Sequence, residues 1–579
     1  MHNFCLIFLL FYIIGCTDSS DTYPNRQPNI IFILTDDQRW DALGYAGNEL
    51  AHTPEMDRLA EDGLYFSHAM VSTPICSASR ATILTGLHER THRYDFRNTV
   101  IREDFMEQSY PVELRKAGYF TGFFGKFGVK YEHADSLFDV FESYDRNNQY
   151  RDYRGYYYKT LDGDTVHLTR YTGQKAIDFL DAVPEDKPFC LSLSFSAPHA
   201  HDGAPEQYFW QEESQEVLAE AEIPEPRLGE KKWFDQLPQS VREGFNRTRW
   251  HWRFDTPEKY QHSVKGYYRM IAGIDREIGK IRAKLEENGL ADNTVIVLMG
   301  DNGYFLGERQ LAGKWLMYDN SVRVPLIIYD PRNDQSGEIT QLVMNVDIPP
   351  TILDLAGADL PQHWQGLSLA PFTSHVNYEL DRDTVLIEHL WEFEHIPPSE
   401  GLRTDRWKYF RYVNDRKIEE LYNLESDPSE TNNLADQPRY RKVLESFRWR
   451  LDRMAYEYRD SSVGVPWDLE VSFESSSGIS KALKESDSAF YIPEYSWKRP
   501  PGAGSQWAYQ ILVASDHAVI DRNVGDIWNS GKVESENFLQ IPHPVGLGSG
   551  GKYFWKVRIW DEFHRLSDYS QVYTFTIAE

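Results

Sequence analysis

The chain has 579 residues, which at roughly 100 to 200 residues per domain is enough for two or three domains. Its formal net charge is -28. Such an acidic chain does not suit general nucleic-acid binding, which needs a basic footprint, so we expect no nucleic-acid partner. If the substrate is an anion, the positive side chains that hold it must be gathered locally.

The N-terminal residues resemble an export signal. Residues 2–15 (HNFCLIFLLFYIIG) form an apolar run that is short for a membrane span and has the length of a signal-peptide core. The run leads into Cys16 in a pattern that resembles a bacterial lipobox. This resemblance implies an exported lipoprotein of a Gram-negative bacterium, lipidated at Cys16 and held by its lipid at the cell surface, the outer membrane or in the periplasm. Cleaved secretion and an uncleaved anchor are the alternatives. We assign residues 1–16 to the signal peptide and lipobox, and 17–27 to a tether.

Three apolar, β-branched runs are typical of strands buried on both faces of a parallel sheet: residues 29–34, 190–195 and 294–299. Polar side chains follow each run. They are Asp36 and Asp37 after the first, His199 and His201 after the second, and Asp301 and Asn302 after the third. Because open α/β sheets bind ligands at the carboxyl ends of their strands, we expect these side chains to meet at one edge.

Helical patterns separate these runs. Residues 53–63 have Pro near the start and Gly at the end, and residues 260–285 carry apolar side chains at helical intervals. The alternation predicts a doubly wound α/β domain over residues 28–375. Residues 376–460 then form short aromatic segments and a helix at 441–459, which predicts a small α+β subdomain.

The remainder of the chain has a different composition. Residues 461–490 are rich in Ser, Pro and Gly and are expected to be a linker. Residues 491–579 alternate apolar and polar side chains at strand period, which predicts an all-β sandwich.

The segment 72–86 (STPICSASRATILTG) contains the cysteine of greatest interest. Two of the four cysteines lie in the export segment, so Cys76 has only Cys190 as a conceivable partner, and a disulfide framework is not expected. Cys76 is predicted to start a helix, where free N–H groups and the helix dipole favour an anion, with Arg80 one turn further on the same face. The alternative is that Cys76 is a small buried hydrophobic residue.

The run CSASR, residues 76–80, followed by ATILTG resembles the signature of the type I sulfatases: Cys or Ser, any residue, Pro or Ala, any residue, Arg. The resemblance implies that a sulfatase-maturating enzyme oxidises Cys76 to formylglycine (3-oxoalanine), the catalytic aldehyde. Ala78 at the third position points to a radical maturase. The short segments of residues 376–460 also resemble the C-terminal subdomain of this family.

The family resemblance extends to the residues around the aldehyde. Asp36, Asp37, Asp301 and Asn302 supply only oxygen ligands, which suits a hard cation, and in sulfatases these positions hold Ca²⁺. A lone Asp at a strand end is more often a cap or turn residue, but the two pairs together favour a metal. The resemblance implies roles for further residues, with Arg80 polarising the aldehyde hydrate, Lys126 and Lys314 binding sulfate, His199 acting as the general acid and His201 reading substrate.

Two positions depart from the family. Many sulfatases have a histidine where this chain has Gly128, and we consider His133 as a replacement or a subgroup that functions without one. Glu308 and Arg309 stand where a histidine is frequent, which suggests a different substrate rim.

The C-terminal sandwich resembles the fibronectin-type domain at the N-terminus of bacterial α-L-rhamnosidases, although a generic spacer is an equal alternative. The combined resemblances imply a sulfuric ester hydrolase for sulfated glycans, with sulfated rhamnose of ulvan as the first expectation and carrageenans, fucoidans or glycosaminoglycans as alternatives. A phosphatase or phosphodiesterase of the related alkaline-phosphatase-like fold, and a catalytically dead glycan-binding protein, are the competing hypotheses.

Overall fold

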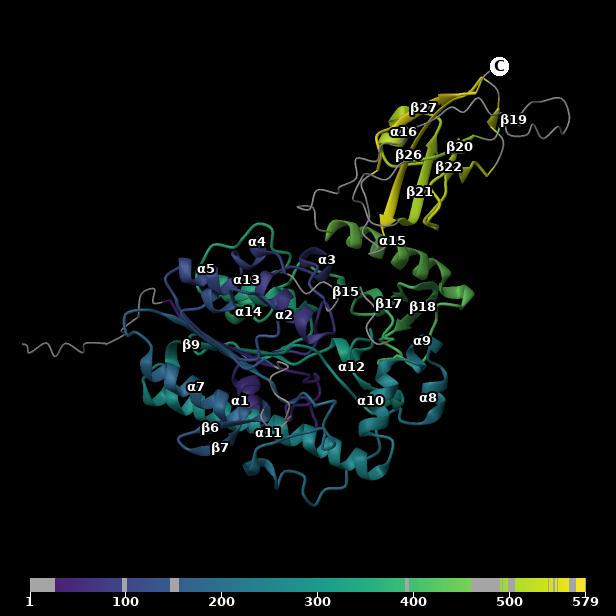
Figure 1. Cartoon of the computed structure of the whole chain (residues 1–579). Helices are drawn as coiled ribbons and strands as arrows, with labels where there is room; N and C mark the ends of the chain where they lie inside the picture. Colours follow the sequence, from purple (N-terminus) through teal and green to yellow (C-terminus); the bar gives the residue numbers. More distant parts are fainter. Residues whose placement is uncertain are drawn as a thin grey trace, which may run out of the picture.

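The computed structural model describes residues 27–95, 101–145, 156–390, 395–459, 490–491, 493–497, 506–539, 541–544, 547–548, 550–561 and 569–577 (Figure 1). The predicted signal peptide and lipobox with Cys16, nearly all of the tether and nearly all of the linker lie outside these residues. Within the described residues, no helix combines the length and apolar character that crossing a membrane requires.

The large domain is built on one mixed sheet of eight strands in the order β13-β2-β12-β9-β1-β8-β4-β5. β1 lies at the centre, parallel to β8 and β9, whereas β12 runs antiparallel to β9 and β2. The eight strands are β1 (Asn29–Thr35), β2 (Leu64–Phe66), β4 (Phe120–Gly125), β5 (Val140–Ser143), β8 (Phe189–Phe195), β9 (Thr294–Gly300), β12 (Leu326–Tyr329) and β13 (Gly337–Ile339).

The three predicted strands are confirmed as β1, β8 and β9. Every residue of each is buried, because helices cover both faces of the sheet. Along β1, Ile30 and Phe32 point into one core and Ile31 and Ile33 into the other. A continuous apolar run is therefore what this position requires.

The helices form two layers (Figure 1). One layer contains α1 (Pro54–Asp62), α7 (Leu168–Ala182) and α11 (Pro257–Glu287), and the other contains α2 (Cys76–Thr85), α5 (Tyr110–Lys116) and α13 (Ile348–Leu355). The predicted helices at residues 53–63 and 260–285 are confirmed as α1 and α11. α11 begins where the Thr256 side chain accepts the Lys259 N–H, and Pro257 starts its first turn.

The small subdomain is a four-stranded antiparallel sheet covered by one helix. Its elements are β15 (Val385–His389), β16 (Ser399–Arg403), β17 (Trp407–Tyr412), β18 (Asp415–Asn423) and α15 (Arg441–Glu457). Leu386, Leu402 and Tyr409 on the sheet pack against Leu444 and Phe447 on the helix. This arrangement confirms the predicted α+β subdomain.

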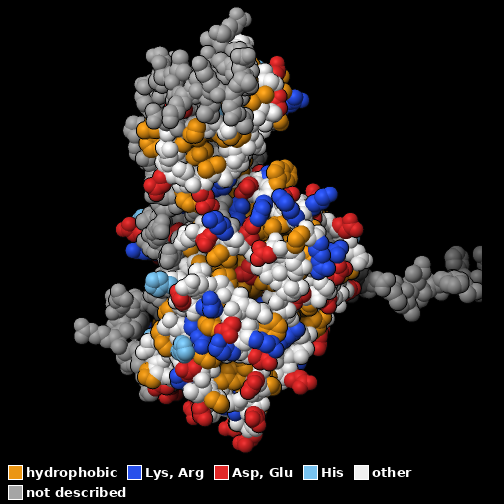
Figure 2. All heavy atoms as spheres, turned by 90° about the vertical axis from the view of Figure 1, so that its right-hand side faces the viewer, with side chains coloured by type: hydrophobic (Ala, Val, Ile, Leu, Met, Phe, Trp, Pro, Cys, Tyr) orange, Lys and Arg blue, Asp and Glu red, His pale blue; other side chains and the backbone are white. Residues whose placement is uncertain are grey.

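The C-terminal domain is a β-sandwich that lies beyond α15 in Figure 1. Its central strands are β21 (Gln506–Ala514) and β26 (Lys552–Asp561), which pair antiparallel around a core that includes Trp497 and Trp555. Tyr456 on α15 packs against Trp560 of the sandwich. Figure 2 shows the right-hand face of Figure 1, where basic and acidic side chains of the described residues are interspersed.

Candidate active site

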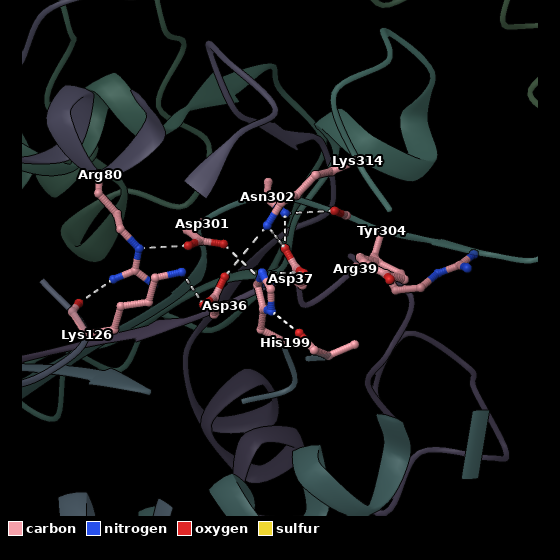
Figure 3. Close-up of polar contacts among 12 residues, drawn as sticks. Asp36, Asp37, Arg39, Arg80, Lys126, His199, Asp301, Asn302, Tyr304 and Lys314 are labelled. Carbon is pink, nitrogen blue, oxygen red and sulfur yellow. Dashed lines mark hydrogen bonds and ion pairs between the residues drawn. The ribbon is translucent and has the colours of Figure 1, made fainter. Parts of the chain in front are cut away.

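The four predicted oxygen ligands meet at the carboxyl edge of the sheet. β1 and β9 are parallel neighbours with Thr35 opposite Gly300, so the residues that follow each strand emerge side by side. The Asp37 N–H donates to Asp301 Oδ1 at 3.1 Å, and Asn302 Nδ2 donates to Asp37 Oδ1 at 2.7 Å. The register of two strands therefore assembles the group (Figure 3).

Three oxygens of this group lack a hydrogen-bond partner although they are buried: Oδ1 of Asp36, Oδ2 of Asp37 and Oδ1 of Asn302. A buried oxygen without a donor is costly, so such atoms are rare unless something else satisfies them. Asp37 also has a φ of +68°, a strained conformation of the kind that occurs at functional sites. These residues fit a hard, oxygen-preferring cation.

Arg80 supports the group from α2. Its Nε donates to Asp301 Oδ2 at 2.8 Å and its Nη1 donates to the Lys126 carbonyl at 2.6 Å. Burial raises the pKa of Asp301 to about 6, with Asp36 adding to the rise and Arg80 opposing it. The arginine thus connects the helix that carries residue 76 to the carboxylates.

Two lysines each face one aspartate. Lys126 follows β4 and its Nζ donates to Asp36 Oδ2 at 2.5 Å, while Lys314 Nζ donates to Asp37 Oδ1. Burial opposes the charged form of Lys126, but the neighbouring acidic groups, Asp36 first among them, together outweigh burial and raise the pKa of the lysine. Burial also favours the neutral acid at Asp36, yet the cations of Lys126, Lys314 and Arg80 lower its pKa. Both predicted lysines therefore lie against the carboxylates as cations.

Cys76 is the first residue of α2, as predicted, and is a half-exposed free cysteine. It acts electrostatically on Arg80, Lys126 and Lys314, raising the pKa of each, so it lies among these three cations. No side chain caps the start of this helix, which leaves its first N–H groups directed towards the same place. The surroundings suit an anion.

The two predicted histidines follow β8. His199 Nε2 is 3.6 Å from Asp37 Oδ2, and together with Asp36 and Asp37 it forms a group that could hold a metal ion. The Asp36 N–H donates to the Ala197 carbonyl at 3.1 Å, which joins the two strand ends. His201 is only half-buried, and its ring packs against Tyr157 with centroids 6.0 Å apart. His199 therefore lies at the carboxylates, and His201 lies further along the loop.

The structure explains the glycine at position 128. Gly128 has a φ of +73°, and a Cβ there would lie 2.6 Å from Arg80 Cδ. A histidine would displace the arginine that holds Asp301. His133, considered as a replacement, is exposed, and its ring packs against Tyr131. Glu308 and Arg309 are buried: the first pairs with Arg39 at 2.6 Å.

The sequence did not single out a second charged cluster beside the histidine loop. Asp202 directly follows His201 and receives hydrogen bonds from Arg249 and Arg253 of α10 (Phe245–Arg253). Arg253 also donates to the Tyr304 hydroxyl at 2.9 Å, two residues after Asn302. One sequence signal could have pointed to Asp202: it is a third polar residue in the loop after a buried strand. Its partners Arg249 and Arg253, however, lie 47 and 51 residues further along the chain.

The fold and the site together define a hydrolase of the alkaline-phosphatase-like α/β class, with a cluster of carboxylates and lysines at one sheet edge. The family described as sulfatase matches residues 28–358, more than half of the chain, and the protein belongs to it. The C-terminal part of N-sulphoglucosamine sulphohydrolases matches residues 307–457, and the Rha78A-like N-terminal immunoglobulin domain matches residues 490–578.

Individual relatives agree with this assignment. An arylsulfatase of Clostridium perfringens is 29% identical over 73% of this chain and 93% of its own, and an ulvan-active sulfatase of Formosa agariphila is 25% identical over 76% and 83%. A structure solved in complex with its substrate, D-glucosamine-2-N,6-O-disulfate, is similar with a TM-score of 0.63 and 26% identity, covering 75% of this chain and 98% of the other.

Proposed function

We propose that this sulfatase hydrolyses sulfate esters of a sulfated glycan, with Cys76 converted to formylglycine and Ca²⁺ held by Asp36, Asp37, Asp301 and Asn302. The observation that carries the proposal is the convergence of three unpartnered buried oxygens with Arg80, Lys126 and Lys314 around residue 76. A purely structural carboxylate cluster would have its oxygens paired.

The described side chains have two roles in this proposal, substrate binding and proton transfer. Lys126 and Lys314 are placed to hold the oxygens of a sulfate group, and the open N-terminus of α2 adds N–H donors. When present, a hydrated aldehyde at residue 76 supplies the attacking oxygen and Ca²⁺ supplies positive charge at the sulfate. His199 Nε2 is the proton source for the leaving sugar oxygen.

The substrate proposed first is a sulfated rhamnose unit of ulvan. Two matches support it: relatives that include an ulvan-active sulfatase and a C-terminal domain that matches the Rha78A-like immunoglobulin domain. Because the relatives also include glycosaminoglycan-related sulfatases, the test uses a panel of ulvan, heparin and carrageenan oligosaccharides. Release of inorganic sulfate identifies the substrate.

Maturation is tested by mass spectrometry of the tryptic peptide that contains Cys76, using protein produced together with a sulfatase-maturating enzyme. We expect the mass of an aldehyde in place of the thiol. An intact thiol in such protein would contradict the proposal and would favour a phosphatase or a catalytically dead binding protein. Assays against phosphate esters and glycan-binding measurements then separate those two alternatives.

The metal is tested by removing it. Chelation of the matured protein should abolish sulfate release, and added Ca²⁺ should restore it. A rate that is unchanged after complete removal of divalent ions would exclude the metal from the proposed reaction.

Export as a lipoprotein is part of the same proposal, since a glycan polymer is met outside the cytoplasm. The expected product is a mature chain that begins at lipidated Cys16, fractionates with the outer membrane and carries the catalytic domain beyond its tether. Replacing Cys16 with Ala should abolish the incorporation of labelled palmitate into the protein, and labelling of this variant equal to that of the wild type would contradict lipidation at Cys16.

A further inference from the structure

The charged cluster beside the histidine loop contains one carboxylate that is only partly enclosed. The side chain of Asp202 is 31% exposed, whereas those of Arg249 and Arg253 are 5% and 0% exposed. Arg253 donates to Asp202 Oδ1 and Arg249 to Oδ2, both from the protein interior. A carboxylate accepts about four hydrogen bonds, so lone pairs of both oxygens remain on the exposed side.

This carboxylate is held rigidly and kept ionised. Burial of the group works against its charge, but the two arginines outweigh this effect and lower the pKa of Asp202. Removing the carboxylate would leave two buried guanidinium groups without the anion they share, so the arrangement is costly to disturb. Asp202 is therefore a fixed acceptor at the surface of the loop that carries His199 and His201.

Contacts on both sides tie the cluster to the active site. Arg249 stacks on Trp315, with its guanidinium carbon 4.6 Å from the ring centroid, and Trp315 directly follows Lys314. The backbone N–H of Trp315 donates to the Pro74 carbonyl at 3.0 Å, two residues before Cys76. On the other side, Arg253 donates to the hydroxyl of Tyr304, which lies two residues after Asn302. Asp202 is thus joined to the segments that carry the nucleophile position, a lysine and a metal ligand.

We propose that Asp202 recognises the sugar of the substrate by accepting hydrogen bonds from hydroxyl groups next to the sulfate ester. The inference rests on the proposed function and names a specificity-determining residue for it. A negative side chain does not bind the sulfate itself, whereas sugar O–H donors suit an ionised acceptor and form charge-assisted hydrogen bonds with it. Arg249 and Arg253 are positioning residues in this arrangement.

The test compares two substrates in variants of the full chain. One is the oligosaccharide of the panel that the wild type hydrolyses fastest, and the other is 4-nitrophenyl sulfate, which has no sugar hydroxyls. In Asp202→Asn the ratio of kcat/KM for the oligosaccharide to kcat/KM for the aryl ester should fall about 10- to 100-fold, the value of hydrogen bonds to a charged group. An unchanged ratio, whether activity is kept or is lost equally on both substrates, would show that Asp202 has only a structural role and would overturn the proposal.

Two further variants guard against misfolding. Asp202→Glu keeps the charge that the two arginines require but moves the carboxylate by one methylene, so the same ratio should fall while the protein stays folded. Asp255→Asn is the matched control, because Asp255 follows the same helix, is 26% exposed and pairs with Lys259 at 2.7 Å. Its ratio should equal that of the wild type.

A binding measurement makes the inference independent of turnover. In Cys76→Ser protein, titration calorimetry with the panel member that binds most tightly should give a Kd at least tenfold lower than in Cys76→Ser/Asp202→Asn protein. Equal Kd values, or no binding by any panel member, would overturn the role of Asp202. If the wild type releases no sulfate while the two Cys76→Ser proteins still differ tenfold in Kd, the proposed function is refuted, but the role of Asp202 in sugar binding is not.

Discussion

Asn302 has a divided role at the scale of the single residue. Its Nδ2 donates to Asp37 Oδ1, whereas its Oδ1 is buried without a hydrogen-bond partner. The amide group therefore orients one carboxylate and offers a neutral oxygen to a cation, which a hydrogen-bonded structural residue would not do.

Replacement of Asn302 with Ala should weaken Ca²⁺ binding at least tenfold while changing the stability of the calcium-free protein by only about 1 kcal/mol, because loss of the hydrogen bond to Asp37 is offset in part by removal of a buried oxygen that lacks a donor. Thermal unfolding with and without Ca²⁺ measures both effects. Calcium at 100 times its Kd should stabilise the wild type by about 2.7 kcal/mol. Equal stabilisation of the wild type and the variant by Ca²⁺ would show that Asn302 is not a ligand of the metal.

Gly128 is the second residue whose surroundings permit a sharp prediction. Its positive φ and its closeness to Arg80 both oppose a side chain, and the arginine cannot easily move because Asp301 and the Lys126 carbonyl hold it. Gly289 has a similar φ of +65° but nothing within 4 Å of its Cβ position. It therefore serves as a matched control for the backbone effect.

We expect Gly128→Ala to lower the free energy of unfolding by about 1 to 3 kcal/mol more than Gly289→Ala, the usual cost of overpacking. Only Gly128→Ala should also slow sulfate release, because Arg80 would shift. Urea unfolding and a sulfate assay of both variants provide the comparison. Equal destabilisation by the two substitutions would show that the contact with Arg80 costs nothing.

At the scale of the element, buried histidines make the packing around α2 sensitive to acid. The His92 ring joins α2 to the turn after it: Nδ1 accepts the Tyr94 N–H at 3.0 Å, and Nε2 lies 3.1 Å from Thr82 Oγ1. Burial lowers the pKa of His92 to about 3, so the folded protein holds this ring neutral. Protonation would break the bond from Tyr94.

Because this pKa is depressed on folding, the stability that His92 contributes is complete above the ordinary histidine pKa of about 6.5 and is lost as the pH falls towards 3. At pH 5, which is about 1.5 units below the ordinary histidine pKa, the free energy of unfolding should be lower by about 2 kcal/mol. Urea unfolding of wild type and His92→Gln at pH 7 and pH 5 tests this. The variant should lose less stability between the two pH values, and parallel losses would contradict the assignment.

At the scale of the whole molecule, buried ion pairs join the large domain to the small subdomain. Arg90, after α2, pairs with Glu388 of β15 and Glu400 of β16, each at 2.9 Å. Glu400 in turn pairs with Arg411 of β17, which reaches Asp452 of α15. The network crosses the subdomain from the catalytic side to the outer helix.

Replacing Arg90 with Met should destabilise the protein by about 3 to 5 kcal/mol, since it leaves the buried Glu388 without its cation and Glu400 with Arg411 alone. The control is Arg102→Met, because Arg102 is a third exposed and pairs with Asp104 at the surface, where such pairs contribute about 0 to 1 kcal/mol. Denaturant unfolding of the two variants gives the difference. Similar small losses would show that the subdomain does not depend on this network.

Local sequence predicted much of this protein. Apolar runs predicted β1, β8 and β9 because strands buried on both faces need continuous apolar side chains, and Pro and Gly at the ends predicted α1. The family signature located Cys76 and Arg80, and parallel strand ends predicted that the oxygen ligands would meet. These features follow from neighbouring residues and from simple sheet geometry.

Only the tertiary structure decided which distant groups touch. Arg249 and Arg253 meet Asp202 because α10 packs beside the histidine loop, and Gly128 must lack a side chain because Arg80 occupies that space. Neither contact leaves a trace in local periodicity, since each depends on how separate segments pack in space. The sequence by itself therefore determined the chemistry available at the sheet edge, and the packing of loops and α10 decided which side chains surround it.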